Sequence, residues 1–98
     1  YVVMTRVELR PGTSEECAEL FRQTNPDVVE EEADWLGAQM VFDSETNTMT
    51  VLALWRDAES YRKMSASDEF KSTMSKFGQF FAGAPEVSVN RVLVDMRR

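Results

Sequence analysis

Residues 50–81 read TVLALWRDAESYRKMSASDEFKSTMSKFGQFF and decide the fold. They begin with an apolar run that ends at Trp55, which is typical of a buried strand. Asp57 and Ser67 then stand at positions suited to helix N-caps, and aromatic and sulfur-containing side chains follow each of them at helical spacing. The stretch therefore predicts a strand, a short helix and a longer helix in direct succession.

The first third of the chain predicts a strand and a helix. Residues 1–9 are rich in Val, Met and Thr, and Arg10-Pro11-Gly12 ends this strand because proline lacks a backbone donor. Thr13 and Glu16 have the spacing of a capping box, and a stripe of apolar residues follows them. Asn25-Pro26 predicts that this helix is kinked or divided in two, since proline disfavours a helical residue before it.

The remaining elements complete an α+β order. Residues 36–42 and 48–55 are strand-like and are joined by polar residues, which predicts an antiparallel hairpin. Gly83-Ala84-Pro85 is expected to end the aromatic helix, and residues 87–96 to form the last strand. The result is a ferredoxin-like βαββαβ plan with an antiparallel four-stranded sheet, and we expect residues 1–98 to form one domain.

The predicted strands are apolar on both faces. Residues 48–55 place Met49, Val51, Ala53 and Trp55 on one face and Leu52 and Leu54 on the other, and residues 87–96 also carry apolar side chains on both faces. Helices on one side of such a sheet would leave its second face uncovered. We therefore expect a homodimer in which two sheets pack face to face.

Composition excludes several functional classes. The net charge is −6 and acidic residues gather between positions 15 and 34, whereas nucleic-acid binding requires a clustered cationic surface, so no nucleic-acid partner is expected. We interpret the acidic residues as a solvated helix face. The chain contains no histidine, which removes the usual zinc and haem ligand sets, and we expect no metal and no cofactor.

Other sequence features indicate a cytoplasmic protein. Cys17 is the only cysteine, so no internal disulfide is expected, and its place on an apolar helix stripe predicts a small core residue. No run approaches the roughly 20 apolar residues that a membrane helix needs. The first residues also lack a signal-peptide pattern, so we expect a cytoplasmic protein without a membrane partner.

Several local motifs together resemble one family. They are Pro11-Gly12, Trp35–Gln39, Val51–Trp55, Asp57–Tyr61 and Ser67–Phe70. With these motifs the chain resembles the antibiotic biosynthesis monooxygenase family over nearly its whole length. The resemblance implies a dimeric α+β barrel built from ferredoxin-like subunits. Some members are cofactor-free oxygenases of phenolic or anthrone-type substrates, others degrade haem, and many have no assigned reaction.

The haem-degrading branch of the family fits the sequence poorly. Resemblance to that branch would require an asparagine in the first strand, a tryptophan in the short helix and an iron-binding histidine in the next helix. Thr5, Met64 and Met74 stand at those positions here. Methionine can bind haem iron, but the other two residues are also replaced, so haem degradation is not expected.

A cofactor-free oxygenase needs a dry apolar cavity and a group that accepts a proton. The pocket candidates are Thr5, Trp55, Tyr61, Met64, Met74, Phe77, Phe81, Asn90 and Arg91. Asn90 or Arg91 could hold an oxyanion, although an ion pair with an acidic residue across the sheet or the dimer is the simpler explanation of Arg91 or Arg6. Each Met and Phe could also be an ordinary core residue.

Two functions follow from these candidates. The first is a cofactor-independent monooxygenase acting on a small aromatic or quinone-like molecule, as the resemblance implies. The second is a non-catalytic ligand-binding or stress-related dimer that reuses the same fold. A lactone isomerase-like or decarboxylase-like activity has no distinguishing residue in the sequence.

Overall fold

The computed structural model describes residues 1–98 and contains four strands and three α-helices. In chain order they are β1 (Val2–Glu8), α1 (Ser14–Val29), β2 (Trp35–Asp43), β3 (Thr48–Trp55), α2 (Ala58–Ser65), α3 (Asp68–Phe77), the 3-10 turn η1 (Gly78–Phe80) and β4 (Glu86–Asn90). The strands form one antiparallel sheet in the order β2-β3-β1-β4. The predicted ferredoxin-like α+β fold is confirmed.

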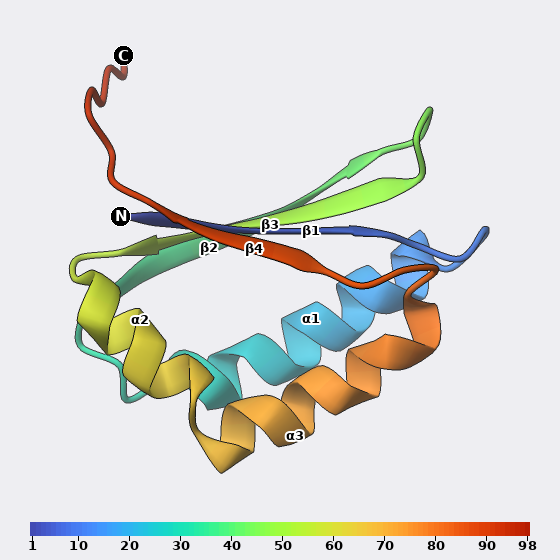
Figure 1. Ribbon diagram of the computed structural model, residues 1–98, viewed down its shortest axis with the longest axis horizontal. Coiled ribbons are helices and arrows are strands. Elements are labelled where there is room, and N and C mark those ends of the chain that lie inside the picture. Colours follow the sequence, from blue (N-terminus) through green and yellow to red (C-terminus); the bar gives the residue numbers. More distant parts are fainter.

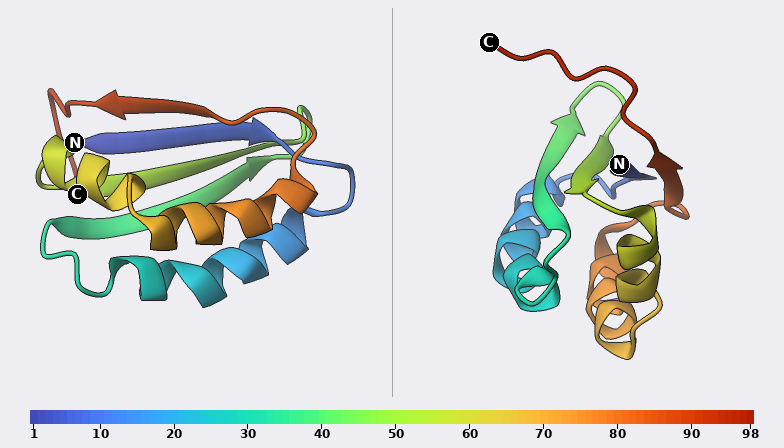
Figure 2. Two further views of the ribbon diagram at one scale, coloured as in Figure 1. Left: turned by 60° about the horizontal axis from the view of Figure 1, so that its bottom comes forward. Right: turned by 90° about the vertical axis from the view of Figure 1, so that its left-hand side faces the viewer.

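All three helices lie on the same side of the sheet (Figures 1 and 2). Residues paired across antiparallel strands share a face, so Val3 lies on one face with Ala53 and Val89. This face carries the buried side chains of the core. The opposite face, called the open face below, carries Leu52 and Leu54 and is not covered by any helix.

Two helix caps agree with the sequence and one does not. The Asp57 carboxylate accepts from the backbone N–H of Glu59 at 3.1 Å, and the Ser67 hydroxyl accepts from the N–H of Phe70 at 3.2 Å. Thr13 caps no donor, so the predicted capping box is wrong. Its backbone lies in the helical region (φ −106°, ψ −1°), not in the extended region usual for an N-cap, and its hydroxyl donates back to the Arg10 carbonyl at 2.7 Å.

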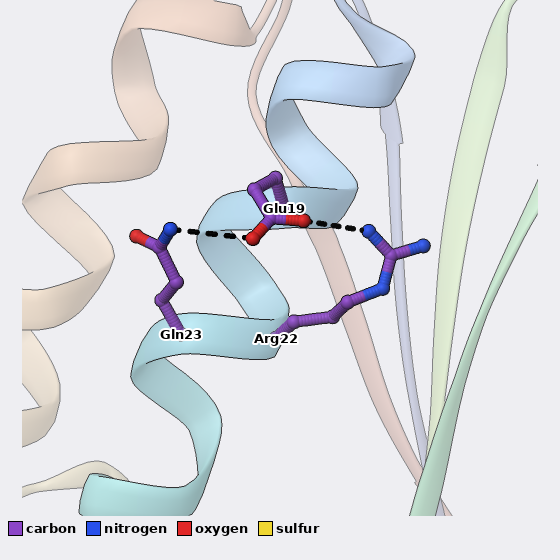
Figure 3. Close-up of polar contacts among 3 residues, drawn as sticks. All are labelled: Glu19, Arg22 and Gln23. Carbon is purple, nitrogen blue, oxygen red and sulfur yellow. Dashed lines mark hydrogen bonds and ion pairs between the residues drawn. The ribbon is translucent and has the colours of Figure 1, made fainter.

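Helix α1 runs through Pro26 without a break, which corrects the prediction of two parts. The last turn is held by the Glu30 N–H, which donates to the Pro26 carbonyl at 2.9 Å, and by Val29, which is buried against the protein interior. Upstream of Pro26, Glu19 accepts from Arg22 at 2.8 Å and from Gln23 at 3.3 Å on the exposed side of the helix (Figure 3). Packing and these contacts outweigh the single backbone bond that proline removes.

The chain between α3 and β4 is bound to the end of β1. Helix α3 ends at Phe77, so the expectation that it extends past Phe81 is wrong. The reason is competition from the sheet, since the N–H of Arg10 donates to the Phe80 carbonyl at 2.7 Å and that of Ala82 to Glu8 at 2.8 Å.

The β2–β3 hairpin is joined to the same end of β1. There the Leu9 N–H donates to the Asn47 carbonyl at 2.9 Å, and the Asn47 side-chain amide donates to the Leu9 carbonyl at 2.7 Å. Three segments far apart in sequence are therefore connected around Leu9, which is 1% exposed.

Strand β4 is shorter than predicted. It ends at Asn90, which pairs with Val2 of β1. Residues 91–98 have no regular secondary structure and are all exposed, so the predicted strand over residues 87–96 is wrong in its second half.

The core has two parts on the covered face. The larger includes Val7, Leu9, Cys17, Met49, Phe77 and Phe80, and the smaller includes Val3, Trp55 and Met64. Cys17 has no exposed surface, which confirms its interpretation as a core residue, and this burial raises the pKa of its thiol. No helix is long and apolar enough to cross a membrane.

Candidate functional site

A cavity of about 100 Å³ lies between the covered face of the sheet and the helices. Fifteen of its 19 lining residues are hydrophobic, so it is an almost entirely apolar space. Strands β1, β2 and β3 provide its floor, and α1, α2 and α3 provide its walls. The helices lie there because each buries an apolar stripe against the sheet.

Seven of the nine residues selected from the sequence line this cavity. They are Thr5, Trp55, Tyr61, Met64, Met74, Phe77 and Phe81. Thr5, Met64 and Met74, at the positions that differ from the haem-degrading branch, are among them. The agreement arises because alternation along β3 identifies the side chains that face the helices, and helical spacing in α2 and α3 identifies those that face the sheet.

Asn90 and Arg91 do not line the cavity, which corrects that expectation. Asn90 pairs with Val2 and lies on the open face, where its side-chain amide donates to the Val2 carbonyl at 3.2 Å and to the Ser88 hydroxyl at 2.9 Å. Arg91 follows the end of β4 and is exposed. Neither Arg91 nor Arg6 forms an ion pair within the chain, so the pairing across the sheet considered for them is wrong, while a pairing across the dimer stays a prediction.

The cavity wall contributed by α1 and part of the cavity floor were not predicted from the sequence. Phe21, Thr24, Asn25 and Val28 line the cavity from α1, and Ala38 and Met40 line it from β2. The helical stripe of α1 and the alternation of β2 were the available signals. Neither shows which end of a stripe lies beside a cavity, because that depends on how the helix sits on the sheet.

Trp55 has the only buried side-chain polar atom without a hydrogen-bond partner. Its ring is 1% exposed, and its Nε1–H finds no acceptor. The ring packs edge to face against Tyr61, with centroids 5.8 Å apart and planes at 67°. Because a buried donor without a partner costs about 1–3 kcal/mol, the position favours an acceptor supplied from the cavity.

Tyr61 is the only ionisable side chain that lines the cavity. Burial raises the pKa of its phenol, and a side-chain hydrogen bond with Ser65 opposes that shift in part. The phenol is therefore protonated at neutral pH and does not act as a base. Thr5, Thr24, Asn25 and Thr73 provide the remaining polar lining, and all four are uncharged.

The cavity is thus neutral and mostly apolar, and it is lined by Trp55, whose buried Nε1–H has no partner. Such a site suits an uncharged flat molecule that has a carbonyl or phenolic oxygen. No three His, Cys, Asp or Glu side chains gather into a group that could hold a metal ion.

Among known proteins, the chain matches one family in sequence and many solved structures in fold. The sequence pattern that defines the antibiotic biosynthesis monooxygenases matches residues 1–76. No curated protein sequence matches the chain.

Solved structures that are similar include candidate antibiotic biosynthesis monooxygenases from two bacteria. The one from Bordetella bronchiseptica has a TM-score of 0.79 and 18% identity, over 94% of this chain and 96% of that one. The one from Caulobacter crescentus has a TM-score of 0.77 and 22% identity, over 93% and 88% of the two chains. A conserved protein from Methanosarcina mazei reaches a TM-score of 0.77 at 19% identity, over 92% and 89%. At these identities the likeness concerns the fold.

Proposed function

The chain belongs to the antibiotic biosynthesis monooxygenase family, and we propose that it is a cofactor-independent monooxygenase of a small aromatic or quinone-like molecule. The observation that supports this proposal is that Trp55 lines an apolar cavity and its buried Nε1–H has no partner. A substrate oxygen would accept that hydrogen bond, and the surrounding Met and Phe side chains would pack against the ring system.

The lining narrows the substrate class. No charged side chain faces the cavity, so a charged ligand would lose its hydration without gaining an ion pair. The volume of about 100 Å³ is also small beside the 300–1,000 Å³ typical of ligand pockets. One- or two-ring substrates therefore fit best, while a three-ring substrate requires flexible side chains such as Met64 and Met74 to move aside.

The proposed reaction balances without an external reductant. A CH₂ group of the substrate becomes C=O, one atom of dioxygen enters the product, and the other leaves as water with the two hydrogen atoms. The substrate supplies all four electrons that reduce dioxygen. The reaction begins when a C–H proton is lost, and the Trp55 N–H would stabilise the oxyanion form of the resulting carbanion.

The protein offers no base for that first step. The cavity contains no carboxylate, lysine or imidazole, and Tyr61 keeps its proton at neutral pH. The proton would therefore pass to water, and the ease of reaction would depend on the acidity of the substrate itself. This absence is also the observation that favours the second function, a non-catalytic protein that binds the same class of molecule.

Ligand binding tests the role of Trp55 directly. Titration with 1,4-naphthoquinone and with naphthalene compares ligands that differ in their acceptor oxygens. We expect wild-type protein to prefer the quinone and Trp55→Phe to bind it about fivefold more weakly, the factor for one hydrogen bond of roughly 1 kcal/mol. Trp35→Phe is the matched control, since Trp35 does not line the cavity and the change should leave the preference intact.

Oxygen uptake separates the two functions. Hydroquinones, naphthols and anthrones would be tested without added metal or flavin, with ¹⁸O₂ to trace the incorporated atom. An oxygenase should incorporate one labelled atom per product, and its pH profile should shift with the pKa of each substrate. Quinone binding without oxygen uptake would favour the non-catalytic binding protein. A Trp55→Phe variant that binds the quinone as tightly as wild type and still prefers it to naphthalene would contradict the proposed site.

We further propose that residues 1–98 form one domain that assembles as a homodimer through its open sheet face. The support is the apolar centre of that face, where Leu52 pairs with Met4 and Leu54 with Val2 without a covering helix. A cytoplasmic location is part of the same proposal and is testable by cell fractionation.

A further inference from the structure

We propose that Thr5, Asn25 and Thr73, called the polar belt below, bind a second oxygen of the ligand in the cavity. The ligand would then be a one- or two-ring molecule with oxygens at opposite ends, one bonded to Trp55 and the other to the belt. This inference rests on the proposed site for an aromatic or quinone-like molecule, and it does not depend on catalysis.

On the cavity floor, the belt lies at the boundary between the two parts of the core. Val3 belongs to the smaller core cluster and Val7 to the larger one, and Thr5 stands between them on β1. Alternate residues of a strand share a face, so all three side chains lie on the covered face. An apolar side chain at position 5 would join the two clusters, and Thr5 instead places a hydroxyl in the cavity lining.

Two of the helices carry a polar residue at the same boundary. On α1, Asn25 stands between Phe21, which packs against the larger cluster, and Val28, which packs against the smaller one. On α3, Thr73 lies one turn after Phe70 at the smaller cluster and directly before the part that packs against the larger one. The two helices run side by side in opposite directions (Figures 1 and 2), so Asn25 and Thr73 line the cavity at the same level.

The side chains of the belt are available to a ligand. Thr24, beside Asn25 on α1, is already engaged, since its hydroxyl donates to the Leu20 carbonyl at 2.8 Å. The three belt side chains form no hydrogen bond within the chain. Their polar atoms also keep accessible surface, because the only fully buried side-chain polar atom without a partner is Nε1 of Trp55. A ligand in the cavity can therefore bond to the belt.

The belt is set apart from Trp55 along the sheet. Thr5 pairs with Val51 on β3, and Trp55 follows four residues later in the same strand, roughly 13 Å farther along it. A ligand that bonds to both places therefore carries two separated oxygens. A ligand with a single oxygen, or with two adjacent oxygens at one end, would leave either Trp55 or the belt without a partner.

The belt suits a wider range of oxygen groups than Trp55 does. An indole N–H only donates a hydrogen bond, whereas a threonine hydroxyl and an asparagine amide both donate and accept. A carbonyl oxygen therefore fits either place, but a phenolic hydroxyl that donates its proton is better placed at the belt. The ligand class is thus a quinone, or a hydroxyketone that directs its carbonyl toward Trp55 and its hydroxyl toward the belt.

Two isomeric quinones test the belt by titration calorimetry. 1,4-Naphthoquinone has its oxygens on opposite sides of one ring, and 1,2-naphthoquinone has the same size with adjacent oxygens. We expect wild-type protein to bind the 1,4 isomer about fivefold more tightly, the factor for one added hydrogen bond. A triple variant with Thr5→Val, Asn25→Leu and Thr73→Val replaces the belt by apolar side chains of similar volume. Its affinities for the two isomers should lie within twofold of each other.

Control variants separate the belt from general effects on the helices. Gln23→Leu and Ser72→Val make similar changes on the exposed sides of α1 and α3, and both should keep the fivefold preference. Urea unfolding shows whether the triple variant is folded. If it is not, Asn25→Leu alone is the test, and this variant should lower the preference at least twofold.

Each contrary outcome has a separate meaning. A fivefold preference that persists in the folded belt variant would overturn the belt, and so would wild-type protein that binds the two isomers equally. In both cases the effect of Trp55→Phe on quinone binding would still test the proposed site by itself. Wild-type protein that binds neither isomer would overturn the site and the belt together. A failure to consume oxygen would contradict the proposed catalysis and leave the comparison of the two isomers unchanged.

Discussion

Trp55 serves the core and the candidate site at the same time. Its ring is buried with Val3 and Met64 in the smaller core cluster, while its Nε1–H has no partner. If this position served packing alone, phenylalanine would avoid the cost of an unpaired buried donor, because its ring has no N–H. Alternation along β3 predicted that Trp55 faces the cavity. It did not predict the orphaned donor, which depends on every side chain packed around the indole.

The pH dependence of stability should reflect Cys17 and Tyr61. Burial raises the pKa of both groups above their unfolded values, so the unfolded chain releases these protons first as the pH rises. The two groups therefore leave the free energy of unfolding unchanged at neutral pH and lower it progressively above about pH 9. Urea unfolding of wild type, Cys17→Ala and Tyr61→Phe between pH 7 and pH 11 measures this effect.

The two variants should separate the contributions. Cys17→Ala should flatten the decline that begins near pH 9, and Tyr61→Phe should flatten the part above pH 10. Parallel declines in all three proteins would show that other groups cause the loss.

Helix boundaries show which structural features a short sequence can predict. Asp57 and Ser67 were predictable as caps because a cap depends on its own backbone conformation and on donors two or three residues away. Pro26 was misleading, since packing of the last turn of α1 against the interior outweighs the local preference. The end of β4 was not predictable either, because it depends on pairing with β1, almost 90 residues earlier in the chain.

Removing the caps should destabilise the protein by similar amounts. We expect Asp57→Ala and Ser67→Ala each to lower the free energy of unfolding by about 1 kcal/mol, the usual value for a lost N-cap. Thr13→Ala is the matched control, because Thr13 precedes a helix but its side chain accepts no helical N–H.

Urea or thermal denaturation would measure these three variants. Thr13 loses only an exposed hydrogen bond to Arg10, so its replacement should cost less than either true cap. A Thr13→Ala variant as unstable as the other two would contradict the difference in capping described here.

At the scale of the whole molecule, the sequence predicted the layers but not the space between them. The βαββαβ order and the covered face follow from periodicity, since each element shows which of its sides is apolar. The shape of the cavity follows from how α1 and α3 pack on the sheet, which no single element encodes. The open face was predictable because Leu52 and Leu54 alternate with residues that clearly belong to the core.

A charge on the open face should dissociate the proposed dimer. Leu52 pairs with Met4 near the middle of the sheet, so Leu52→Glu would place an unpaired carboxylate in the apolar centre of the proposed interface. We expect this variant to sediment as a monomer at concentrations where wild type is a dimer. Gln23→Glu adds the same charge on the exposed side of α1 and should leave the dimer intact. A Leu52→Glu variant that dimerises as well as wild type would show that the interface lies elsewhere.

The hydrogen bonds around Leu9 have a mechanical consequence for the cavity. They attach the chain after α3 to β1, and β1 to the β2–β3 hairpin, at one end of the molecule. At the other end, Ser67 in the α2–α3 junction has only local backbone bonds, to Met64 and Lys71. The α2–α3 junction is held instead by packing of Met64 and Phe70 with Trp55, and α2 also by the Ser60–Asp34 hydrogen bond. Because the junction has no backbone bond to the sheet, local opening that admits a ligand should begin there and should leave the bonds around Leu9 intact.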